Sequence, residues 1–300
     1  MDMLRVEEVS KRYENHTALN KVSLHIPKGS IFGLLGPNGA GKTSLIRIIN
    51  QITAPDEGTV YLNGTPLQPA DISKIGYLPE ERGLYAKMKV YEQLLYLAQL
   101  KSLHKNEAKK RINYWMKRFD ILSWKNKTIE ELSKGMAQKV QFISTVIHEP
   151  SLLIFDEPFT GFDPINTNII KEEIKRLRDE GATIIFSTHR MESVEEICDH
   201  IALINKAEKL LEGPLREIKN AHRTNKFMAE IKGAAAPSKE IENHTDHSAQ
   251  YGDVLHLELH WPHEKRNDLI RMLMNMGELL TFKEQIPSLN EIFIQKVQAI

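Results

Sequence analysis

The stretch with the clearest chemical meaning is rich in glycine and ends in a lysine and a hydroxyl residue. It matches the pattern G-x-x-x-x-G-K-[ST], whose backbone wraps the phosphates of ATP or GTP. The expected phosphate-binding residues are Gly36, Pro37, Asn38, Gly39, Ala40, Gly41, Lys42, Thr43 and Ser44. Glycines allow the tight turn that points successive N–H groups into one concavity. Lys42 would reach the β- and γ-phosphates, and the Thr43 hydroxyl would take a Mg²⁺ position. The alternative is a glycine-rich turn that matches by chance.

Two consecutive acids form the second chemical signal. Asp156 and Glu157 directly follow the apolar run Leu152–Phe155. If that run is a strand, the acids lie at the carboxyl edge of a sheet, where α/β proteins hold ligands. Asp156 would bind the Mg²⁺ that bridges the phosphates, directly or through water. Glu157 can polarise a water for in-line attack on the γ-phosphate. Standing alone, the same pattern also fits a strand followed by a solvated acidic turn.

The elements that must position these residues are predicted from hydrophobic pattern and turn residues. Ile31–Leu35 reads as a strand that leads into the glycine loop, and a helix is expected from about Lys42. Near the start, Leu4–Val9 and Val22–Ile26 alternate as strands, with Lys11–Asn20 expected as a turn region between them. The further strands expected as far as Leu211 are Thr59–Leu62, Ile75–Leu78, Leu152–Phe155, Thr183–Ser187, Ile201–Asn205 and Lys209–Leu211. Asn63-Gly64 is a strong hairpin signal.

Helical periodicity dominates from about Val90 to His148, which predicts a helical subdomain inserted into the α/β core. Another helix is expected over Ile165–Glu180, closed by Gly181, and a shorter one over Met191–Cys198. The composition shifts after Ile218, and the segment as far as Gly252 is polar without a clear period. The elements expected beyond it are a strand at Val254–Leu259, a helix at Lys265–Met276, a strand at Leu279–Lys283 and a helix at Leu289–Val297.

Composition narrows the function classes. The chain has 300 residues, enough for about two domains. Its 40 basic and 40 acidic residues balance, so no overall field recruits nucleic acid or an anionic membrane. Cys198 is the single cysteine, which excludes an internal disulfide and fits a reducing cytosol. We expect no signal peptide and no membrane span, so any membrane pore belongs to another chain.

A third motif identifies a family. Leu132-Ser133-Lys134-Gly135-Met136 precedes the two acids and resembles the signature sequence of ATP-binding cassette (ABC) ATPases. The resemblance implies that Ser133 and Gly135 clasp the γ-phosphate of ATP held by the opposite subunit. Lys134 and Met136 replace the more usual glycine and glutamine. Alone, Leu-Ser-x-Gly is a common helix start; its place between the two ATP motifs favours the signature.

Further family elements follow in order. Thr160–Asp163 resembles the D-loop that couples two ATP sites, and His189 resembles the switch histidine that senses γ-phosphate. Tyr13 resembles the aromatic residue that stacks on adenine, although a packing tyrosine is the alternative. In the Q-loop region Glu80 stands where the family usually has a glutamine. A carboxylate can still ligate Mg²⁺, and a solvated loop glutamate is the competing interpretation.

The resemblance implies an α/β, P-loop NTPase core of the ABC type (1–221) with an inserted helical subdomain (about 84–150), plus a small C-terminal α+β domain (222–300). The tail, which ends Pro-Ser-Leu-Asn-Glu-Ile-Phe over 287–293, resembles ATPase subunits of bacterial ABC-2 type exporters, similar to NatA-like sodium-export ATPases. Glu157, His189 and Lys42 would be catalytic, with Thr43, Asp156 and Glu80 at the metal.

The resemblance also implies the partners and the setting. Implied cofactors are ATP and Mg²⁺, and implied partners are a second copy of the chain and an integral membrane permease, with no nucleic acid. The expected location is cytoplasmic, at the inner face of the membrane. The alternative function class is a soluble ABC ATPase that acts on a macromolecular complex without a permease. A P-loop kinase has no use for the signature sequence.

Overall fold

The protein is described from a computed structural model that covers residues 1–81 and 83–298. The chain divides into two compact units, Met1–Leu215 and a second that begins at Arg216. The expected boundary between 221 and 222 falls at the end of helix α7 (Leu215–Ala221), whereas the units divide at its start.

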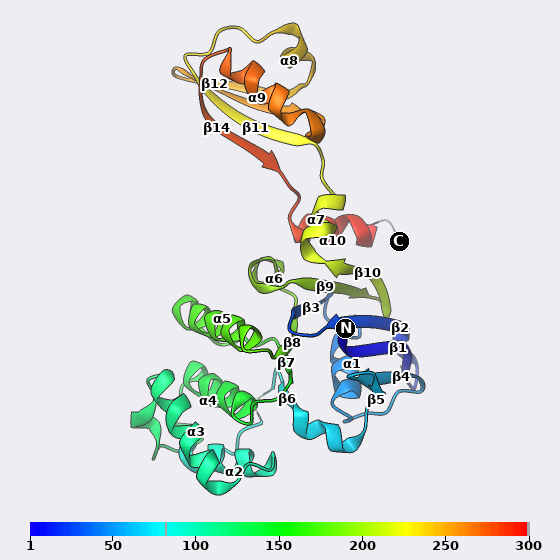
Figure 1. The fold of residues 1–300 in the computed structure, drawn as a ribbon, viewed down its shortest axis with the longest axis vertical. Coiled ribbons are helices and arrows are strands. Elements are labelled where there is room, and N and C mark those ends of the chain that lie inside the picture. Colours follow the sequence, from blue (N-terminus) through cyan, green and yellow to red (C-terminus); the bar gives the residue numbers. More distant parts are fainter. Residues whose placement is uncertain (82, 299–300) are drawn as a thin grey trace. The chain divides into compact units, whose positions relative to one another are not determined.

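A six-stranded sheet forms the centre of the first unit (Figure 1). Across the sheet its strands are β10 (Glu208–Pro214), β9 (His200–Asn205), β3 (Ile31–Leu35), β8 (Thr183–Thr188), β7 (Leu152–Asp156) and β6 (Ile75–Leu78). The five from β9 to β6 are parallel, and β10 runs antiparallel to β9. Every residue of β3, β7 and β8 is buried, which explains their continuous apolar runs. The strands expected at these positions are confirmed.

A second, antiparallel sheet contains the N-terminal strands. Its order is β2 (His16–Pro27), β1 (Asp2–Tyr13), β4 (Glu57–Leu62) and β5 (Thr65–Pro66). The hairpin expected at Asn63-Gly64 is confirmed, with φ of 50° and 81° at the two residues. The turn region expected over Lys11–Asn20 is wrong, because β1 and β2 stay paired until Tyr13 faces His16. Register shifts near Val9 and Lys11 break the alternation that would have revealed these strand ends.

Helices cover the parallel sheet and build the inserted subdomain. Those of the core are α1 (Lys42–Ile49), α5 (Pro164–Asp179) and α6 (Met191–Ile197), with the 3₁₀ turn Pro69–Lys74. Those inserted between β6 and β7 are α2 (Val90–Leu100), α3 (Lys105–Arg118) and α4 (Lys134–Val146), with the 3₁₀ turns Leu122–Trp124 and Ile129–Glu131. In Figure 1, helices α2, α3 and α4 lie together at the end of the unit beyond β6. The inserted helical subdomain is therefore present.

Aromatic rings attach the inserted helices to the sheet. Phe142 of α4 stacks on Phe155 of β7, with ring centroids 5.4 Å apart and planes 19° apart. Trp115 and Phe119 of the α3 segment also pack on Phe142, with ring centroids 6.4 Å and 5.6 Å away. All four rings are buried. Because Phe155 immediately precedes Asp156, this stack joins α4 to the strand that carries the acids.

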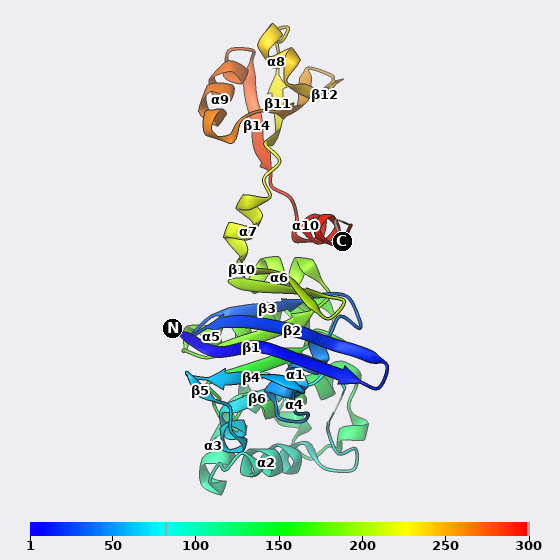
Figure 2. The ribbon, with the colours of Figure 1, turned by 90° about the vertical axis from the view of Figure 1, so that its right-hand side faces the viewer.

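The second unit is a small α+β domain (Figure 2). Its antiparallel sheet has the order β12 (Thr245–Tyr251), β13 (Val254–His260), β11 (Lys226–Lys232) and β14 (Glu278–Gln285). Its remaining elements are α8 (Lys239–Asn243), α9 (Arg266–Met274), α10 (Leu289–Gln298) and the 3₁₀ turn His263–Lys265. One face of the sheet forms a core around Phe227, Leu257 and Leu269. The expected strands and helices from Val254 onward are confirmed, whereas β11 and β12 were not predicted, because the sequence before Gly252 has no clear period.

Within the described residues, none of the helices has the length and apolar character that a bilayer crossing requires.

We expect a half-buried histidine to make the stability of the first unit depend on pH. His148 lies between α4 and β7; its Nε2 is 3.4 Å from the carbonyl oxygen of Ile75, and its Nδ1 is buried with no hydrogen-bond partner among residues 1–81 and 83–298. Burial, reinforced by nearby Lys101, lowers the pKa of His148 to about 4. In the unfolded chain the pKa is close to 6.5, so between pH 6.5 and 4 the unfolded state binds more protons.

We expect the unfolding free energy to fall as pH drops through this window, by up to about 3 kcal/mol from this group. His148→Gln removes the titration but keeps a donor. Urea unfolding at pH 7 and 5 should show a smaller loss of stability in the variant than in the wild type. An equal loss in both proteins would show that His148 is protonated as readily in the folded state.

Candidate nucleotide-binding site

The glycine loop follows β3 and leads directly into α1. Gly36 and Gly41 have φ of 147° and 114°, which favour glycine. Space is equally decisive: a Cβ on Gly36 would lie 2.0 Å from the carbonyl oxygen of Ile204, and one on Gly41 would lie 2.2 Å from that of Ala18. The loop therefore packs against β9 on one side and β2 on the other. Helix α1 begins at Lys42, which leaves its first N–H groups available to an anion.

Lys42 is the buried cation of the loop. Its Nζ donates hydrogen bonds to the carbonyl oxygens of Gly36 at 2.7 Å and Pro37 at 3.0 Å. Burial lowers the pKa of Lys42, and the negative charges of Glu157, Asp156 and Glu80 oppose that shift. The ammonium group is thus held between the loop and a group of acids.

One cavity gathers most of the predicted residues. It has a volume of about 320 Å³ and is hollowed beside the glycine loop. The predicted residues that line it are Tyr13, Asn38, Gly39, Gly41, Lys42, Thr43, Ser44, Glu80, Asp156 and Glu157. Gly36, Pro37 and Ala40 belong to the loop but do not line the cavity. Glu80, Asp156 and the loop each lie at the carboxyl end of a parallel strand, which is why segments distant in sequence meet here.

The two consecutive acids differ in their surroundings. Asp156 ends β7 and is 3% exposed; burial raises its pKa, Glu157 and Glu80 add to the rise, and Lys42 counteracts it. Glu157 adopts a left-handed backbone, φ 49°, which turns it away from the strand direction. Its carboxylate accepts hydrogen bonds from the Thr188 hydroxyl at 3.0 Å and the His189 backbone N–H at 2.9 Å.

His189 reaches the cavity through Glu157. Its Nδ1 lies 2.7 Å from Glu157 Oε1. Because an ionised carboxylate only accepts hydrogen bonds, we assign the proton to Nδ1. This leaves Nε2 as the atom of the ring that is free to meet a ligand. A buried carboxylate fixed by a hydroxyl, an amide and an imidazole is arranged to orient a water molecule.

The signature residues lie elsewhere. Ser133 caps α4, its hydroxyl accepting from the Met136 N–H at 3.3 Å. A Cβ on Gly135 would lie 3.4 Å from the carbonyl oxygen of Gly161, so the start of α4 borders the segment 160–163. Neither Ser133 nor Gly135 lines the 320 Å³ cavity. The structure therefore brings the signature beside the D-loop segment but not to the phosphate loop of the same chain.

The oxygen donors of the cavity fit a magnesium ion that is shared with phosphates. In the part of the chain that the structure describes, no group of three or more His, Cys, Asp or Glu side chains is arranged to hold a metal alone. Mg²⁺ usually takes only one or two carboxylates and completes its shell with water and substrate phosphates. The Thr43 hydroxyl and the carboxylates of Asp156 and Glu80 are donors of that kind within one cavity.

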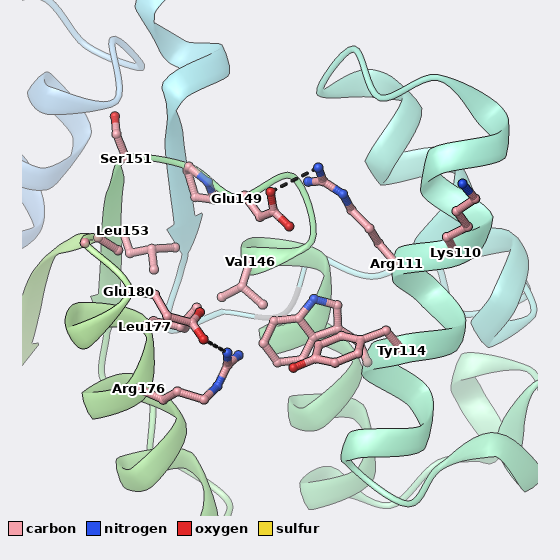
Figure 3. Close-up of a pocket in the computed structure, with 14 residues that line it drawn as sticks. Lys110, Arg111, Tyr114, Val146, Glu149, Ser151, Leu153, Arg176, Leu177 and Glu180 are labelled. Atoms are coloured by element: carbon pink, nitrogen blue, oxygen red, sulfur yellow. Dashed lines mark hydrogen bonds and ion pairs between the residues drawn. The ribbon is translucent and has the colours of Figure 1, made fainter.

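Another cavity, of about 660 Å³, lies between the inserted helices and α5 (Figure 3). Arginines point into it from both sides, but each is already paired. Arg111 meets Glu149 at 3.0 Å, and Arg176 pairs with Glu180. Tyr114 adds an aromatic wall. Since its guanidinium groups are neutralised and no glycine loop borders it, this cavity does not resemble a triphosphate site.

Two residues of the nucleotide cavity were missed by the sequence reasoning. His16 and Ala18 line it from the first residues of β2. In the hairpin, His16 is the direct partner of Tyr13. The sequence could have indicated His16 only through that pairing. A tyrosine and a histidine that flank a two-residue turn lie on the same face of the hairpin, so a cavity that contains Tyr13 also contains His16.

Comparison with known proteins agrees with this geometry. A family model described as ABC transporter matches residues 19–160, and one described as the C-terminal domain of DrrA1-3-like ATP-binding proteins matches 213–297. YhaQ, an uncharacterized ABC transporter ATP-binding protein of Bacillus subtilis, is 40% identical over 99% of both chains. The chain belongs to the ABC transporter ATP-binding proteins. It is an ATPase whose hydrolysis of ATP is coupled to transport.

Other similar proteins extend the comparison. The ABC transporter ATP-binding protein NatA of Bacillus subtilis is 38% identical over 74% of this chain and 94% of its own. The bacitracin transport ATP-binding protein BcrA of Enterococcus faecalis is 33% identical over 84% and 83%. Among solved structures, an ATP-binding subunit of an ABC transporter has a TM-score of 0.69 at 29% identity, covering 73% of this chain and 92% of that one. A dimeric bacterial ABC transporter cassette at 24% identity shares the fold, with a TM-score of 0.66 over 71% and 99%.

Lys42→Ala tests the phosphate assignment. Loss of a charge-assisted hydrogen bond should weaken ATP binding about tenfold to a hundredfold. Isothermal titration calorimetry measures the affinity directly. Lys110→Ala, an exposed lysine of the 660 Å³ cavity, is the matched control and should bind ATP like the wild type. Unchanged affinity in Lys42→Ala would exclude Lys42 from the phosphates.

Proposed function

We propose that this chain is the nucleotide-binding subunit of an exporter and that two copies close head to tail around two ATP molecules. The observation that supports this best is the division of the site. The phosphate loop and the acids share one cavity, whereas Ser133 and Gly135 lie outside it. A site that lacks its signature within one chain is completed when a second copy presents Ser133 and Gly135 to the bound γ-phosphate. The dimeric cassette of the same fold is consistent with such an arrangement.

Within each site the residues take distinct roles. Lys42 and the N-terminus of α1 would hold the β- and γ-phosphates, and Tyr13, which lines the cavity, would stack on adenine. Thr43, Asp156 and Glu80 would hold Mg²⁺, which neutralises charge on the phosphates when bound. Glu157 orients the attacking water and accepts its proton. His189, tied to Glu157 through Nδ1, would sense the γ-phosphate with the Nε2 side of its ring.

A groove beside Glu80 is the proposed contact with a membrane permease. Its volume is about 670 Å³, and leucines 84, 97 and 100 give it apolar walls. Leu100 is 61% exposed, so the groove offers apolar surface to a partner. Through that permease the chain would lie on the cytoplasmic face of the membrane. Co-purification of the full chain with a multi-span protein supports this; a chain that stays in soluble complexes supports a non-transport ATPase.

The names of relatives support export of a small toxic compound as part of the proposal, whereas sodium as cargo rests on the NatA-like resemblance of the tail. BcrA is named for bacitracin transport, and a relative from Cupriavidus metallidurans for Nod factor export. We propose export of sodium or of a small toxic compound. Stimulation of ATP hydrolysis by candidate cargoes, measured with the permease in vesicles, distinguishes the two.

Glu157→Gln tests catalysis and dimer closure together. Removing the proton acceptor should slow hydrolysis by about 10² to 10⁴ while ATP still binds, so the closed dimer should accumulate. Phosphate release gives the rate, and size-exclusion chromatography with ATP gives the oligomeric state. Glu149→Gln, an exposed acid of the 660 Å³ cavity, is the control. A normal rate of ATP hydrolysis in Glu157→Gln would exclude Glu157 as the proton acceptor. A wild-type protein that hydrolyses ATP rapidly while it stays monomeric would contradict the proposed dimer.

Glu80→Gln tests the metal role of the Q-loop residue. The amide keeps an oxygen donor but loses a negative charge, so half-saturation of ATP hydrolysis by Mg²⁺ should need several-fold more metal. Glu81→Gln changes the neighbouring acid, which does not line the cavity, and should leave the Mg²⁺ dependence unchanged. Identical Mg²⁺ curves for Glu80→Gln and the wild type would show that Glu80 is a solvated loop residue.

A further inference from the structure

The loop that carries Glu80 is held by buried amides of the inserted helices. On α4, Gln141 is 4% exposed, and its Nε2 donates to the carbonyl oxygens of Pro79 and Glu81, both at 3.3 Å. Pro79 and Glu81 are the residues that precede and follow Glu80. One side-chain amide therefore donates hydrogen bonds to the loop on both sides of Glu80, the residue that lines the nucleotide cavity.

The far end of the same loop is held from α2. Gln93 is fully buried, and its Oε1 accepts from the backbone N–H of Tyr85 at 2.9 Å. The loop leaves the sheet at the end of β6, yet these side-chain contacts tie it to the inserted helices. Its position is consequently set by those helices as well as by the sheet.

Packing alone does not account for a glutamine at position 141. Because both loop partners are carbonyl oxygens, the amide nitrogen must face them. The amide oxygen is then left buried, with no hydrogen-bond partner among the described residues. An unpaired buried oxygen destabilises a fold, and a methionine would fill similar space without it. The two donated hydrogen bonds are what the glutamine adds.

The helix that carries Gln141 is also the helix that begins at the signature. Ser133 is its N-cap, and Gln141 lies two turns further along. One turn before Gln141, the buried Gln138 donates to the carbonyl oxygen of Pro158 at 3.4 Å, next to Glu157. The inner face of α4 thus contacts both loops that bring acids into the cavity.

We propose that Gln141 is a positioning residue: it fastens the Glu80 loop to the signature helix, so that a displacement of α4 carries Glu80 with it. The Mg²⁺ consequence rests on the proposed role of Glu80. The attachment of the loop by Gln141 does not rest on that role, because these hydrogen bonds form within the chain in the absence of nucleotide and metal.

Gln141→Met is the decisive variant, and Thr145→Val is its matched control. Thr145 is buried one turn further along α4, and its hydroxyl donates to the carbonyl oxygen of Gln141 within the helix at 3.0 Å. The same hydroxyl lies 3.5 Å from the carbonyl oxygen of Tyr77 on β6, which precedes the residues whose exchange is compared. Hydrogen exchange of the full chain without nucleotide or metal should be about threefold to tenfold faster over residues 79–85 in Gln141→Met. Thr145→Val should match the wild type there. Equal exchange in Gln141→Met and the wild type overturns the inference.

Mg²⁺ titrations of ATP hydrolysis then separate this inference from the proposed function. Gln141→Met should raise the half-saturating Mg²⁺ several-fold and leave ATP affinity in EDTA unchanged. Added to Glu80→Gln, it should cause no further increase, because it acts through Glu80. If Glu80→Gln shifts the Mg²⁺ curve and Gln141→Met does not, the positioning role is wrong. If neither variant shifts the Mg²⁺ curve but hydrogen exchange is faster in Gln141→Met, Gln141 does hold the loop and Glu80 does not bind the metal.

A second variant guards against misfolding. If Gln141→Met does not fold, Gln141→Asn keeps an amide that is too short to reach both carbonyls. It should show the same faster exchange over residues 79–85, and exchange equal to that of the wild type would again overturn the inference.

Discussion

One buried ammonium group faces three carboxylates in the nucleotide cavity, and the rest of the site is arranged around that balance. Lys42 is stabilised by Glu157, Asp156 and Glu80 against the cost of burial. The same acids would repel a triphosphate if nothing else opposed them. Backbone N–H groups of the glycine loop, the N-terminus of α1 and a divalent cation are the groups that offset this repulsion. The cavity is thus electrostatically suited to a metal-bound nucleotide more than to a free anion.

The inserted helices are attached to the core in two physically different ways. Phe142 and Phe155 form an apolar stack, which tolerates small sliding because dispersion has little directional preference. The amides of Gln138 and Gln141 make directional hydrogen bonds to loops. A helix attached in this way can shift on its aromatic contact while its polar contacts pull the loops along.

The sequence predicted most of the parallel sheet and the phosphate loop because their signals are local. Buried strands appear as apolar runs, and the loop needs glycine for both conformation and space. The ends of β1 and β2 were missed because register shifts and solvent exposure hide the alternation. In the second unit, β12 is mostly exposed, and its partners become clear only when β13 pairs with it.

The polar positions were harder to predict than the apolar ones. His16 enters the cavity only through its pairing with Tyr13 across the hairpin. Gln93 and Gln141 are polar residues on helices, and such residues are usually solvated. They are buried because a loop packs over them, and the hydrophobic periodicity of their helices gives no indication of that loop. By contrast, the family resemblance already implied that Ser133 acts on ATP held by another subunit, and in the structure Ser133 lies outside the cavity beside the phosphate loop.

The place of the inserted subdomain also sets the order of assembly during synthesis. β6 is the edge strand of the parallel sheet, and its neighbour is β7. Residues 79–151 separate the two strands, so at about 5–20 residues per second β7 leaves the ribosome roughly 4–15 seconds after β6. Joining distant segments costs loop entropy, and a connection that is already compact reduces that cost. Early folding of α2, α3 and α4 would therefore deliver β7 to β6 and shorten the time for which the apolar edge of β6 is exposed to other chains.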